Sequence, residues 1–548
     1  MPVLTPAEAD TLAFLETDQP ALVDRYLAAL RPARRRTLGL LTAALLREGL
    51  VPVDPAGDIA LPDGPLRVRI DGEHAFGRPQ IGAVLADDRE LEHPAELLAL
   101  LIKAGVGGGR RWEDLATELS ESVANLAMSY ACVADRPVRS DLPHLQFDRL
   151  CAEGHNIHPC GRARGGMRPA ESFRYAGECA GDVRLAVVAV RLDHLSSTEV
   201  GDLVRTVYPE IVVPPGYGLV LVHPWQLEHV IPAGYAAELA GGTIRVLDFR
   251  IRSTPTVSLR TVVTDRGLVV KTALDLLITT SRRSISPATT YNTPRLGLLL
   301  RSLIEADPEL ASRAQVVREV AGACFRPETG WAGRNLSTVL REDPSRFTAD
   351  GETAVTGCAL YADGVLAVLI GDRDPLDVLA EYAALLLPVV LTFLTGHGIG
   401  LEAHLQNTVV VWRDGRPVRL LLRDLAGIRI DRTRFAGDFE PHPDSIIVVD
   451  GPQGARHKAF YCALQANLAE VISTMVAEFG VAESDCWDLV RAEAHRVFDR
   501  LETRWPDRAI PDRAAMFAPT LGQKSFLRMR LHPGTGDAYI QVPNPLHS

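Results

Sequence analysis

The chain has 548 residues and a formal net charge of −11 at pH 7. This length predicts two or three domains with ample core, and the negative charge argues against non-specific nucleic-acid binding, which needs a basic surface. The segment Met1–Asp10 lacks the apolar stretch of a signal peptide, and the eight cysteines are scattered without a Cys-x-x-Cys pair. We therefore expect a cytoplasmic protein with reduced thiols.

Residues 5 to about 140 are predicted to be mainly helical. Apolar residues recur at helical spacing in Ala21–Leu46 and in Ala95–Ala131, and a strand pair near Leu66–Ile70 interrupts them. The glycine-rich segment Gly105–Gly109 has neither a preceding strand nor a following Gly-Lys-Ser/Thr, so we interpret it as a turn and not as a phosphate loop.

Residues 141 to about 300 show the pattern of β-strands. The predicted strands are Arg184–Leu192, Leu219–Val222, Thr243–Ile251, Val257–Thr264 and Leu268–Lys271, the last two joined by a turn at Asp265–Gly267. From about residue 311 onward helices are predicted to dominate. The apolar run Tyr382–Leu394 is shorter than the roughly 20 residues of a membrane span and contains Pro388, which favours a buried helix.

The loop Glu153–Gly166 combines several glycines with two imidazoles and two guanidiniums, those of His155, His158, Arg162 and Arg164. Arginine binds phosphate and carboxylate groups in a bidentate manner, so anion binding is the favoured interpretation. One alternative is a purely structural loop. Another is a zinc site of Cys151, His155, His158 and Cys160, whose spacing matches no common structural zinc pattern.

A second cluster of cations and hydroxyls lies between residues 258 and 283. It consists of Ser258, Arg260, Lys271, Thr279 and Arg283. Ser258 and Arg260 would share one face of a strand, with Lys271 on the partner strand. The segment from Thr279 to Arg283 is expected to begin a turn or helix whose free N–H groups attract anions. The set suits a triphosphate, and a solvated sheet face is the alternative.

The segment Glu402–Asn407 brings a carboxylate, an imidazole and two amides together, and Asp424 follows it. Between them, two apolar strands are predicted around a turn at Asp414–Gly415, which places Asn407 beside Asp424. This arrangement resembles the catalytic loop and metal-binding aspartate of kinase-like enzymes, and it indicates an enzyme that uses a nucleotide. The alternative is a purely structural polar cluster.

Chemistry assigns roles within this segment. Carboxylates are hard oxygen ligands suited to Mg2+, so Glu402 and Asp424 are candidate magnesium ligands. His404 is a candidate substrate contact or proton acceptor. Gln406 and Asn407 are suited to orienting carboxylate or ribose oxygens.

Two further motifs are weaker when taken alone. His223–Gln226 is equally well explained by a buried structural histidine and tryptophan. Lys524–Arg530 carries cations at alternating or helical spacing, which by itself predicts a solvated face.

Taken in order, these motifs resemble the NRPS-independent siderophore synthetases, the aerobactin-synthetase-like family. The family pattern E-G-H-P-x-H-P-x-x-K-x-R-x-G corresponds to Glu153–Gly166, with Asn156 in place of the proline and Arg162 in place of the lysine. The other matching motifs are His223–Gln226, Ser258-x-Arg260, Lys271, Thr279 with Arg283, Glu402–Asn407, Arg423-Asp424-x-x-Gly427, and Lys524 with Met529–Leu531.

The resemblance implies an α+β fold shaped like a cupped hand. It comprises a helical thumb over residues 1–140, a β-rich, ATP-binding fingers domain over 141–310, and a mainly helical palm over 311–548. The palm would hold the kinase-like catalytic hairpin, the magnesium and substrate site, and a C-terminal helical region similar to ferric-siderophore reductases.

The resemblance also implies an activity. With ATP and Mg2+ as cofactors, the enzyme would adenylate a carboxylate, often citrate, and an amine or alcohol would then displace AMP. A homodimer acting on small molecules is expected, with no role for nucleic acid or membrane.

By the same resemblance, individual residues receive roles. His404, Arg283 and Lys271 would be catalytic, and Glu402 and Asp424 would bind Mg2+. The carboxylate substrate would contact Thr279, Arg283, His404 and Lys524. ATP would contact His155, His158, Arg162, Arg164, Ser258, Arg260, Lys271, Thr279, Arg283, Gln406 and Asn407.

Two other functions are alternatives to the synthetase activity. A kinase-like phosphotransferase would release ADP, and the hairpin with His404, Asn407 and Asp424 favours it. A binder or reductase of ferric siderophores would need clustered cysteines for an iron–sulfur centre, whereas Cys462 and Cys486 are isolated in the sequence.

Overall fold

The computed structural model describes residues 3–278, 281–326, 330–532 and 538–547. The helices of its first half are α1 (Pro6–Asp18), α2 (Val23–Arg47), α3 (Pro94–Lys103), α4 (Arg110–Val133), α5 (His144–Asp148), α6 (Pro169–Tyr175), α7 (Val200–Val207), α8 (Pro224–His229), α9 (Ile231–Gly234) and α10 (Ala236–Ala240). Those of its second half are α11 (Pro287–Ala306), α12 (Pro308–Ala311), α13 (Gly330–Asn335), α14 (Val365–Ile370), α15 (Pro375–His397), α16 (Pro452–Phe460), α17 (Ala469–Phe479), α18 (Glu483–Arg504), α19 (Pro506–Met516) and α20 (Phe526–Leu531).

The strands alternate with these helices. They are β1 (Arg67–His74), β2 (Arg78–Ala86), β3 (Arg89–Glu90), β4 (Val183–Arg191), β5 (Leu195–Ser197), β6 (Tyr217–Val222), β7 (Ile244–Pro255), β8 (Thr261–Thr264), β9 (Val269–Thr272), β10 (Leu277–Ile278), β11 (Ser281–Arg282), β12 (Ala314–Val316), β13 (Glu319–Phe325), β14 (Ser337–Arg341), β15 (Thr353–Thr356), β16 (Ile399–Gly400), β17 (Thr408–Arg413), β18 (Arg416–Leu422), β19 (Arg429–Asp431), β20 (Val448–Val449), β21 (Thr520–Lys524) and β22 (Tyr539–Pro543). The α+β class is therefore confirmed.

The N-terminal part is helical, as predicted. Helices α2 and α4 pack against each other, and the predicted strand pair forms the antiparallel sheet β1-β2-β3. The glycine segment Gly105–Gly109 connects α3 to α4 as a turn, which confirms that interpretation. A buried ion pair between Arg34 of α2 and Glu8 of α1, 2.7 Å apart, holds the first helix against the second.

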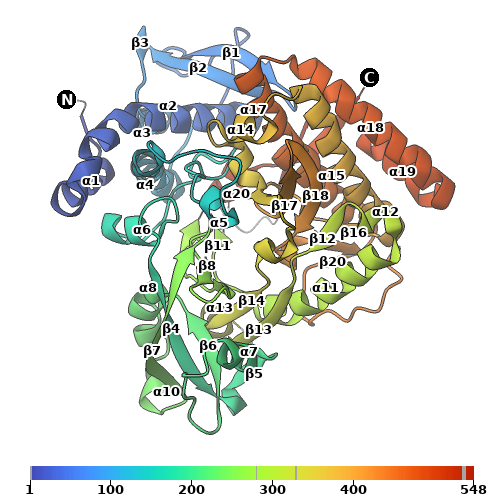
Figure 1. Cartoon of the computed structure of the whole chain (residues 1–548). Helices are drawn as coiled ribbons and strands as arrows, with labels where there is room; N and C mark the ends of the chain where they lie inside the picture. The colour runs from blue at the N-terminus through green and yellow to red at the C-terminus, as the bar shows by residue number, and fades with distance from the viewer. Residues whose placement is uncertain (1–2, 279–280, 327–329, 533–537, 548) are drawn as a thin grey trace.

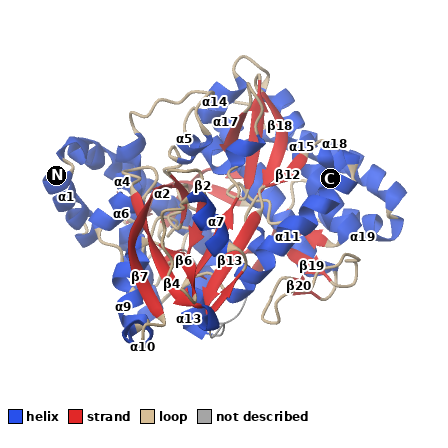
Figure 2. Cartoon of the chain, turned by 60° about the horizontal axis from the view of Figure 1, so that its bottom comes forward, coloured by secondary structure: helices blue, strands red, loops and turns tan. Residues whose placement is uncertain are grey.

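A large curled sheet follows, with strand order β5-β13-β14-β9-β8-β7-β4-β6 (Figure 2). The turn Asp265–Gly267 joins β8 to β9 as predicted. Two of its strands, β13 and β14, lie in a region that we predicted to be helical, and that prediction is wrong. Both segments are rich in small and β-branched residues and are buried within the sheet, so sheet packing outweighs helix propensity there.

A smaller sheet of order β12-β18-β17-β15 lies beside α15. Asp374 caps α15 through the N–H groups of Leu376 and Asp377, and Gly398 ends it in the left-handed conformation. The apolar run Tyr382–Leu394 lies within this helix and is almost wholly buried, which confirms a core helix.

Two helical stretches, Pro375–His397 and Pro452–Phe479, are long and apolar enough to cross a membrane. In both, 78% of the apolar window is buried inside the protein, as in core helices of soluble folds.

The three parts of the chain meet near the centre of the molecule. In Figure 1 the N-terminal helices and hairpin lie at the top left, the large sheet below them, and the C-terminal half at the right. The C-terminal helix α20 returns to the N-terminal helices, where the Glu48 carboxylate accepts bonds from the Leu527 and Arg528 N–H groups. The domain boundaries at 140 and 310 stay a prediction.

The prediction of reduced thiols is wrong at one place. Cys132 and Cys179 form a disulfide between the end of α4 and the turn after α6, across 47 residues of sequence. Scattered spacing concealed this pair, because the two cysteines meet only when α4 packs beside α6. The other six cysteines are free thiols.

Candidate active site

A cavity of about 510 Å³ opens where the large sheet, the Glu153–Gly166 loop and the C-terminal half meet. Most of the predicted site residues line it, although they come from distant parts of the sequence. They are His155, Arg162, Arg164, Ser258, Arg260, Lys271, Arg283, Glu402, His404, Gln406, Asn407, Asp424 and Lys524. His158 does not line it, and Thr279 lies outside the described residues.

The predicted hairpin forms one wall of the cavity. Strands β17 and β18 pair antiparallel around Asp414 and Gly415, which both have positive φ angles as this tight turn requires. At the open end, the Arg423 N–H donates to the Asn407 carbonyl at 3.0 Å, which places Asn407 beside Asp424. That part of the prediction is confirmed.

Asp424 has an unusual backbone. Its φ of 60° and ψ of 72° lie in the left-handed region, which non-glycine residues seldom occupy. Such conformations persist where surrounding contacts enforce them, and they concentrate at functional sites. In this conformation the Asp424 carboxylate contacts Lys271 of the large sheet.

Lys271 of β9 meets that carboxylate. Its ammonium group donates to Asp424 Oδ1 at 2.5 Å and to Glu319 Oε1 at 3.4 Å. Burial would raise the pKa of Asp424, but the positive charges of Lys271 and Arg260 outweigh this effect and hold that pKa well below its usual range. Asp424 is therefore anionic at neutral pH.

Glu402 has its own cation, which our sequence reasoning missed. The Lys458 ammonium group, on α16, donates to Glu402 Oε1 at 2.6 Å. Burial opposes ionisation of Glu402, yet Lys458 and then His404 lower its pKa to about 2. Because Lys458 lies 56 residues further along the sequence, on α16, no local motif marks it.

Gly427 provides the space for this carboxylate. A Cβ atom built at Gly427 would collide with the carboxylate of Glu402. The Asn407 amide also donates to Glu402 Oε2 at 3.3 Å and lies 3.5 Å from the Asp424 carbonyl. The amide therefore links the two candidate metal ligands.

The prediction for the cluster of cations and hydroxyls between residues 258 and 283 needs a correction. Ser258 and Arg260 do not lie on a strand, because the chain turns at residues 257–260 between β7 and β8. Both still line the cavity, and Arg260 donates to the carbonyls of Arg283 and Ser284 at 2.7 and 3.1 Å. Burial, with Arg260 nearby, lowers the pKa of Arg283 to about 10, so its guanidinium stays charged at neutral pH.

The Glu153–Gly166 loop differs more from expectation. The His158 side chain is fully buried behind the cavity, where its Nδ1 accepts from the Cys160 N–H at 3.0 Å. Burial, reinforced by His155, lowers the pKa of His158 to about 3. Its predicted contact with ATP is not supported by this position.

Arg162 and Arg164 line the cavity, but their guanidinium groups also bind the buried carboxylate of Glu178. Both donate to Oε1 of Glu178 at 2.9 Å. The zinc alternative finds no support, because among the described residues no three of Cys151, His155, His158 and Cys160 bring ligand atoms together.

Other residues missed by the sequence reasoning are aromatic. Tyr361 and Tyr461 line the cavity, and Tyr461 opens a π-helical segment, Tyr461–Leu468, after α16. Such widened turns occur often at functional sites. The Lys524–Arg530 segment is not simply a solvated face either, because Lys524 lines the cavity and Arg530 is buried against Glu118.

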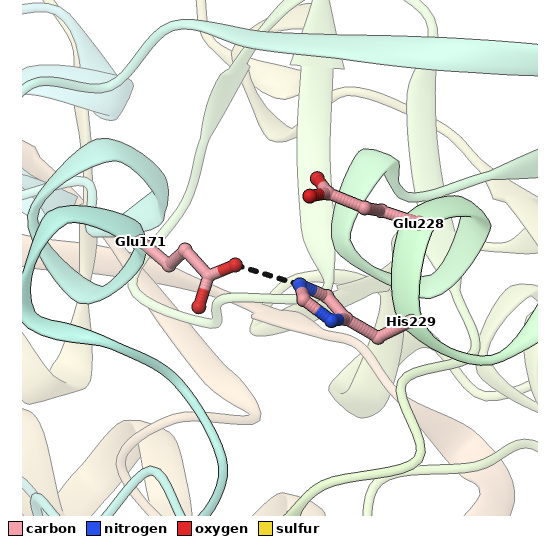
Figure 3. Close-up of side chains that lie close together, drawn as sticks. All are labelled: Glu171, Glu228 and His229. Carbon is pink, nitrogen blue, oxygen red and sulfur yellow. Dashed lines mark hydrogen bonds and ion pairs between the residues drawn. The ribbon is translucent and has the colours of Figure 1, made fainter.

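A separate group of possible metal ligands lies away from the cavity. Glu171 of α6 faces Glu228 and His229 of α8 (Figure 3), with ligand atoms within 4.8 Å of one another. Glu171 accepts from His229 Nε2 at 2.7 Å and from the Arg168 N–H at 2.8 Å. These bonds account for the cluster as a link between α6 and α8.

Comparison with known proteins shows which family the chain resembles. The pattern of the IucA / IucC family matches residues 143–362, and that of the ferric iron reductase FhuF-like transporter matches residues 377–537. The D-ornithine--citrate ligase of Staphylococcus aureus is 27% identical over 87% of this chain and 84% of its own. Residues 143–362 of this chain are thus similar to the IucA / IucC family. The resemblance inferred from the ordered motifs is thereby confirmed.

Other relatives have related names. Staphyloferrin A synthase of S. aureus is 26% identical over 76% of this chain and 74% of its own. A citryl-spermidine/3,4-dihydroxybenzoyl-citryl-spermidine:spermidine ligase of Bacillus anthracis is 24% identical over 73% and 72%. The relatives named here are ligases and synthases, which supports a ligase.

Solved structures share the fold. The petrobactin biosynthesis protein AsbB of B. anthracis superimposes with a TM-score of 0.83 at 20% identity, covering 100% of this chain and 98% of that one. ATP-bound aerobactin synthetase IucA of Klebsiella pneumoniae gives 0.75 at 18% identity, covering 94% and 99%. The expected synthetase architecture is thus confirmed.

Proposed function

We propose that this protein is an ATP-dependent synthetase that adenylates a carboxylate and condenses the acyl-adenylate with an amine or alcohol in siderophore-type biosynthesis. The observation that carries the proposal is that cationic side chains outnumber carboxylates in the cavity. Arg260, Lys271, Arg283, Lys458 and Lys524 line it together with the carboxylates of Glu153, Glu402 and Asp424.

The chemistry explains why such a cavity suits adenylation. A carboxylate oxygen attacks the α-phosphorus of ATP, the bond from this phosphorus to the bridging oxygen breaks, and pyrophosphate leaves. Several negative charges must approach one another in that step, and fixed cations in a partly dehydrated cavity stabilise them without reorganisation. We assign Ser258, Arg260, Lys271 and Arg283 to the triphosphate, and Arg283 and Lys524 to the carboxylate substrate.

The second step needs mainly positioning and a proton acceptor. The amine or alcohol attacks the acyl carbon, loses a proton, and AMP leaves. Burial lowers the pKa of His404, with Glu402 opposing part of that effect, so the imidazole is neutral at pH 7 and able to accept the proton. We therefore assign this role to His404.

Glu402 and Asp424 fit the requirements of a magnesium site. Both are ionised and line one cavity, and Asn407 adds an amide between them. They would hold Mg2+ when it enters with ATP, and the ion would neutralise phosphate charge there. In the absence of nucleotide, Lys458 and Lys271 balance their charges.

For the substrate we propose citrate or a citryl derivative. Two relatives have names that refer to citrate or citryl compounds, the D-ornithine--citrate ligase and the citryl-spermidine ligase. The cationic cavity is consistent with a polycarboxylate. We further expect a cytoplasmic homodimer that acts on small molecules, with neither nucleic acid nor a membrane as a partner.

A kinase-like phosphotransferase is the second candidate, because Lys271 pairs with Asp424 beside the hairpin. It would transfer the γ-phosphoryl group and release ADP. Against it, the cavity holds several cations, whereas a kinase-like enzyme would provide a single phosphate-binding lysine.

A reductase activity has less support. The segment that matches FhuF contains Cys462 and Cys486, and each is a buried free thiol. Among the described residues no group of cysteines lies close enough to ligate an iron–sulfur cluster.

Nucleotide product analysis separates these functions. The protein would be incubated with ATP, Mg2+, a panel of carboxylates that includes citrate, and hydroxylamine as a general nucleophile. We expect AMP and pyrophosphate that depend on one carboxylate. ADP and phosphate would instead support the phosphotransferase, and a purified protein with an iron–sulfur absorption spectrum would support the reductase.

A further inference from the structure

One face of α4 contacts the segments that build the cavity wall. Ser122, Asn125, Ser129 and Cys132 are spaced by three and four residues, so they lie on the same side of the helix. Ser122 Oγ donates to the Pro159 carbonyl, and Asn125 Nδ2 to the Arg162 carbonyl, both at 3.1 Å. These two contacts hold the loop against the helix.

The next two positions of the same face contact the turn after α6. Ser129 Oγ donates to Glu178 Oε1 at 2.9 Å, and Cys132 is covalently bonded to Cys179. The disulfide therefore joins α4 to the residue directly after Glu178. Figure 1 shows α4 and α6 beside each other, and the two helices are in contact.

Glu178 is the centre of a buried charge cluster. Only 4% of it is exposed, and its Oε1 accepts from Arg162, Arg164 and Ser129. Burial would raise the pKa of Glu178, but the two arginines lower it to about 2. A carboxylate this deep in the protein is stable only while both guanidiniums remain in place.

Arg162 connects this cluster to the cavity. Besides Glu178, its Nη2 donates to the carbonyls of Cys151 and Glu153 at 2.5 and 3.1 Å. Glu153, Arg162 and Arg164 all line the cavity. A displacement of Glu178 would therefore release the loop that forms one side of the site.

We propose that Glu178 is a positioning residue for this cavity wall and that the Cys132–Cys179 disulfide is a reversible redox lock on it. With the disulfide formed, Glu178 is held against α4 and the loop is ordered. When it is reduced, the turn that carries Glu178 is free to move and the loop loosens. The lock does not depend on which reaction the cavity performs, but the activity measurements below rest on the proposed function.

The switch is a two-electron thiol–disulfide exchange. A dithiol carrier of the thioredoxin class donates two electrons and two protons, the S–S bond breaks, Cys132 and Cys179 become thiols, and the carrier becomes a disulfide. Oxidation reverses the exchange with a small-molecule disulfide. Both cysteines are partly exposed and thus open to attack. Disulfides of cytosolic proteins are usually redox-sensing or catalytic and not permanent, which fits a protein predicted to be cytoplasmic.

Hydrogen–deuterium exchange tests the lock without any substrate. Protein purified without reductant would first be alkylated and digested to establish whether Cys132 and Cys179 are bonded. Exchange of peptides from residues 153–166 is then compared before and after reduction by a dithiol. We expect reduction to speed exchange there several-fold and to leave the peptides of α15 unchanged.

A Cys132→Ser/Cys179→Ser double variant is the matched control. It should show the fast exchange in both conditions, because it has no bond to reduce. Equal exchange in oxidised and reduced wild type would overturn the proposal, as would two free thiols in the protein purified without reductant.

Glu178 itself is tested by substitution. Glu178→Gln removes the charge but keeps an acceptor oxygen, so it should loosen residues 153–166 less than Glu178→Ala does. In carboxylate-dependent AMP release, we expect both to raise the KM for ATP or for the carboxylate, by about tenfold in the alanine variant, more than they lower kcat. Folded variants with an unchanged loop and unchanged KM would contradict the positioning role. If the Glu178 variants do not fold, the hydrogen-exchange comparison of oxidised and reduced wild-type protein still decides whether the lock exists. If no AMP is formed with any carboxylate, only the proposed function fails.

Discussion

The ammonium nitrogen of Lys271 lies 2.5 Å from Oδ1 of Asp424, although 153 residues separate them in the sequence. This ion pair joins the eight-stranded sheet to the hairpin across the cavity. Behind it lies the fully buried Glu319, 3.4 Å from the same nitrogen. One cation therefore balances a carboxylate of the eight-stranded sheet and a carboxylate in the segment that follows β18.

Lys271→Met should abolish AMP release and also destabilise the protein. It leaves the buried Glu319 without its cation, which costs roughly 3 kcal/mol. Adding Glu319→Gln removes this unpaired buried charge. The double variant should therefore recover much of the stability measured by urea unfolding while staying inactive. Recovery of activity in the double variant would show that Lys271 does not contact the reacting groups.

Gly427→Ala should nearly eliminate activity, because the added methyl group displaces the Glu402 carboxylate. Gly108→Ala is the matched control, since a Cβ there has nothing within 4 Å and its φ is not positive. We expect the first variant to need a much higher Mg2+ concentration for any AMP release, and the second to behave as wild type. A magnesium titration measures both, and normal magnesium dependence in Gly427→Ala would remove Glu402 from the site.

Arg283→Ala should abolish adenylation while leaving the fold intact, because it removes a cation from the cavity lining. The neighbouring Arg282→Ala serves as the control, because Arg282 is exposed and donates to Asp275 outside the cavity lining. Pyrophosphate release and thermal unfolding would be measured for both. Near-wild-type turnover of Arg283→Ala would overturn its assignment.

Lys524→Ala should mainly raise the KM for the carboxylate, by about tenfold for the loss of one charged contact. Its position next to α20 allows the side chain to be removed without disturbing a helix. Initial rates at varied carboxylate and varied ATP separate the two sites. An effect confined to ATP would place Lys524 at the nucleotide.

The buried histidines should make the fold sensitive to mild acid. Burial lowers the pKa of His158 to about 3 from its usual 6.5, so below pH 6.5 the unfolded chain binds a proton that the folded protein excludes. Stability then falls as pH decreases from 6.5 toward 3, by about 2 kcal/mol at pH 5 for this one group. His158→Gln should lose less stability than wild type between pH 7.5 and pH 5 in urea unfolding. Parallel losses would show that His158 takes up its proton equally readily in the folded and unfolded states.

The chemistry of the site was visible in the sequence wherever neighbouring residues carry it. The hairpin around Asp414 and Gly415, the strand with Lys271 and the helix over Tyr382–Leu394 follow from turn chemistry, β-propensity and apolar periodicity, which act over a few residues. The ordered motifs were sufficient to indicate the family. Most of the site residues that they predicted line the cavity.

Only the tertiary structure decided which of these groups face one another. Lys458 pairs with Glu402, Glu178 binds Arg162 and Arg164, and Cys132 bonds Cys179 because elements distant in sequence pack together. His158 carries the family motif yet lies buried behind the cavity. Local propensity is a property of short segments, whereas burial and charge pairing depend on long-range packing, and no spacing rule in the sequence encodes that packing.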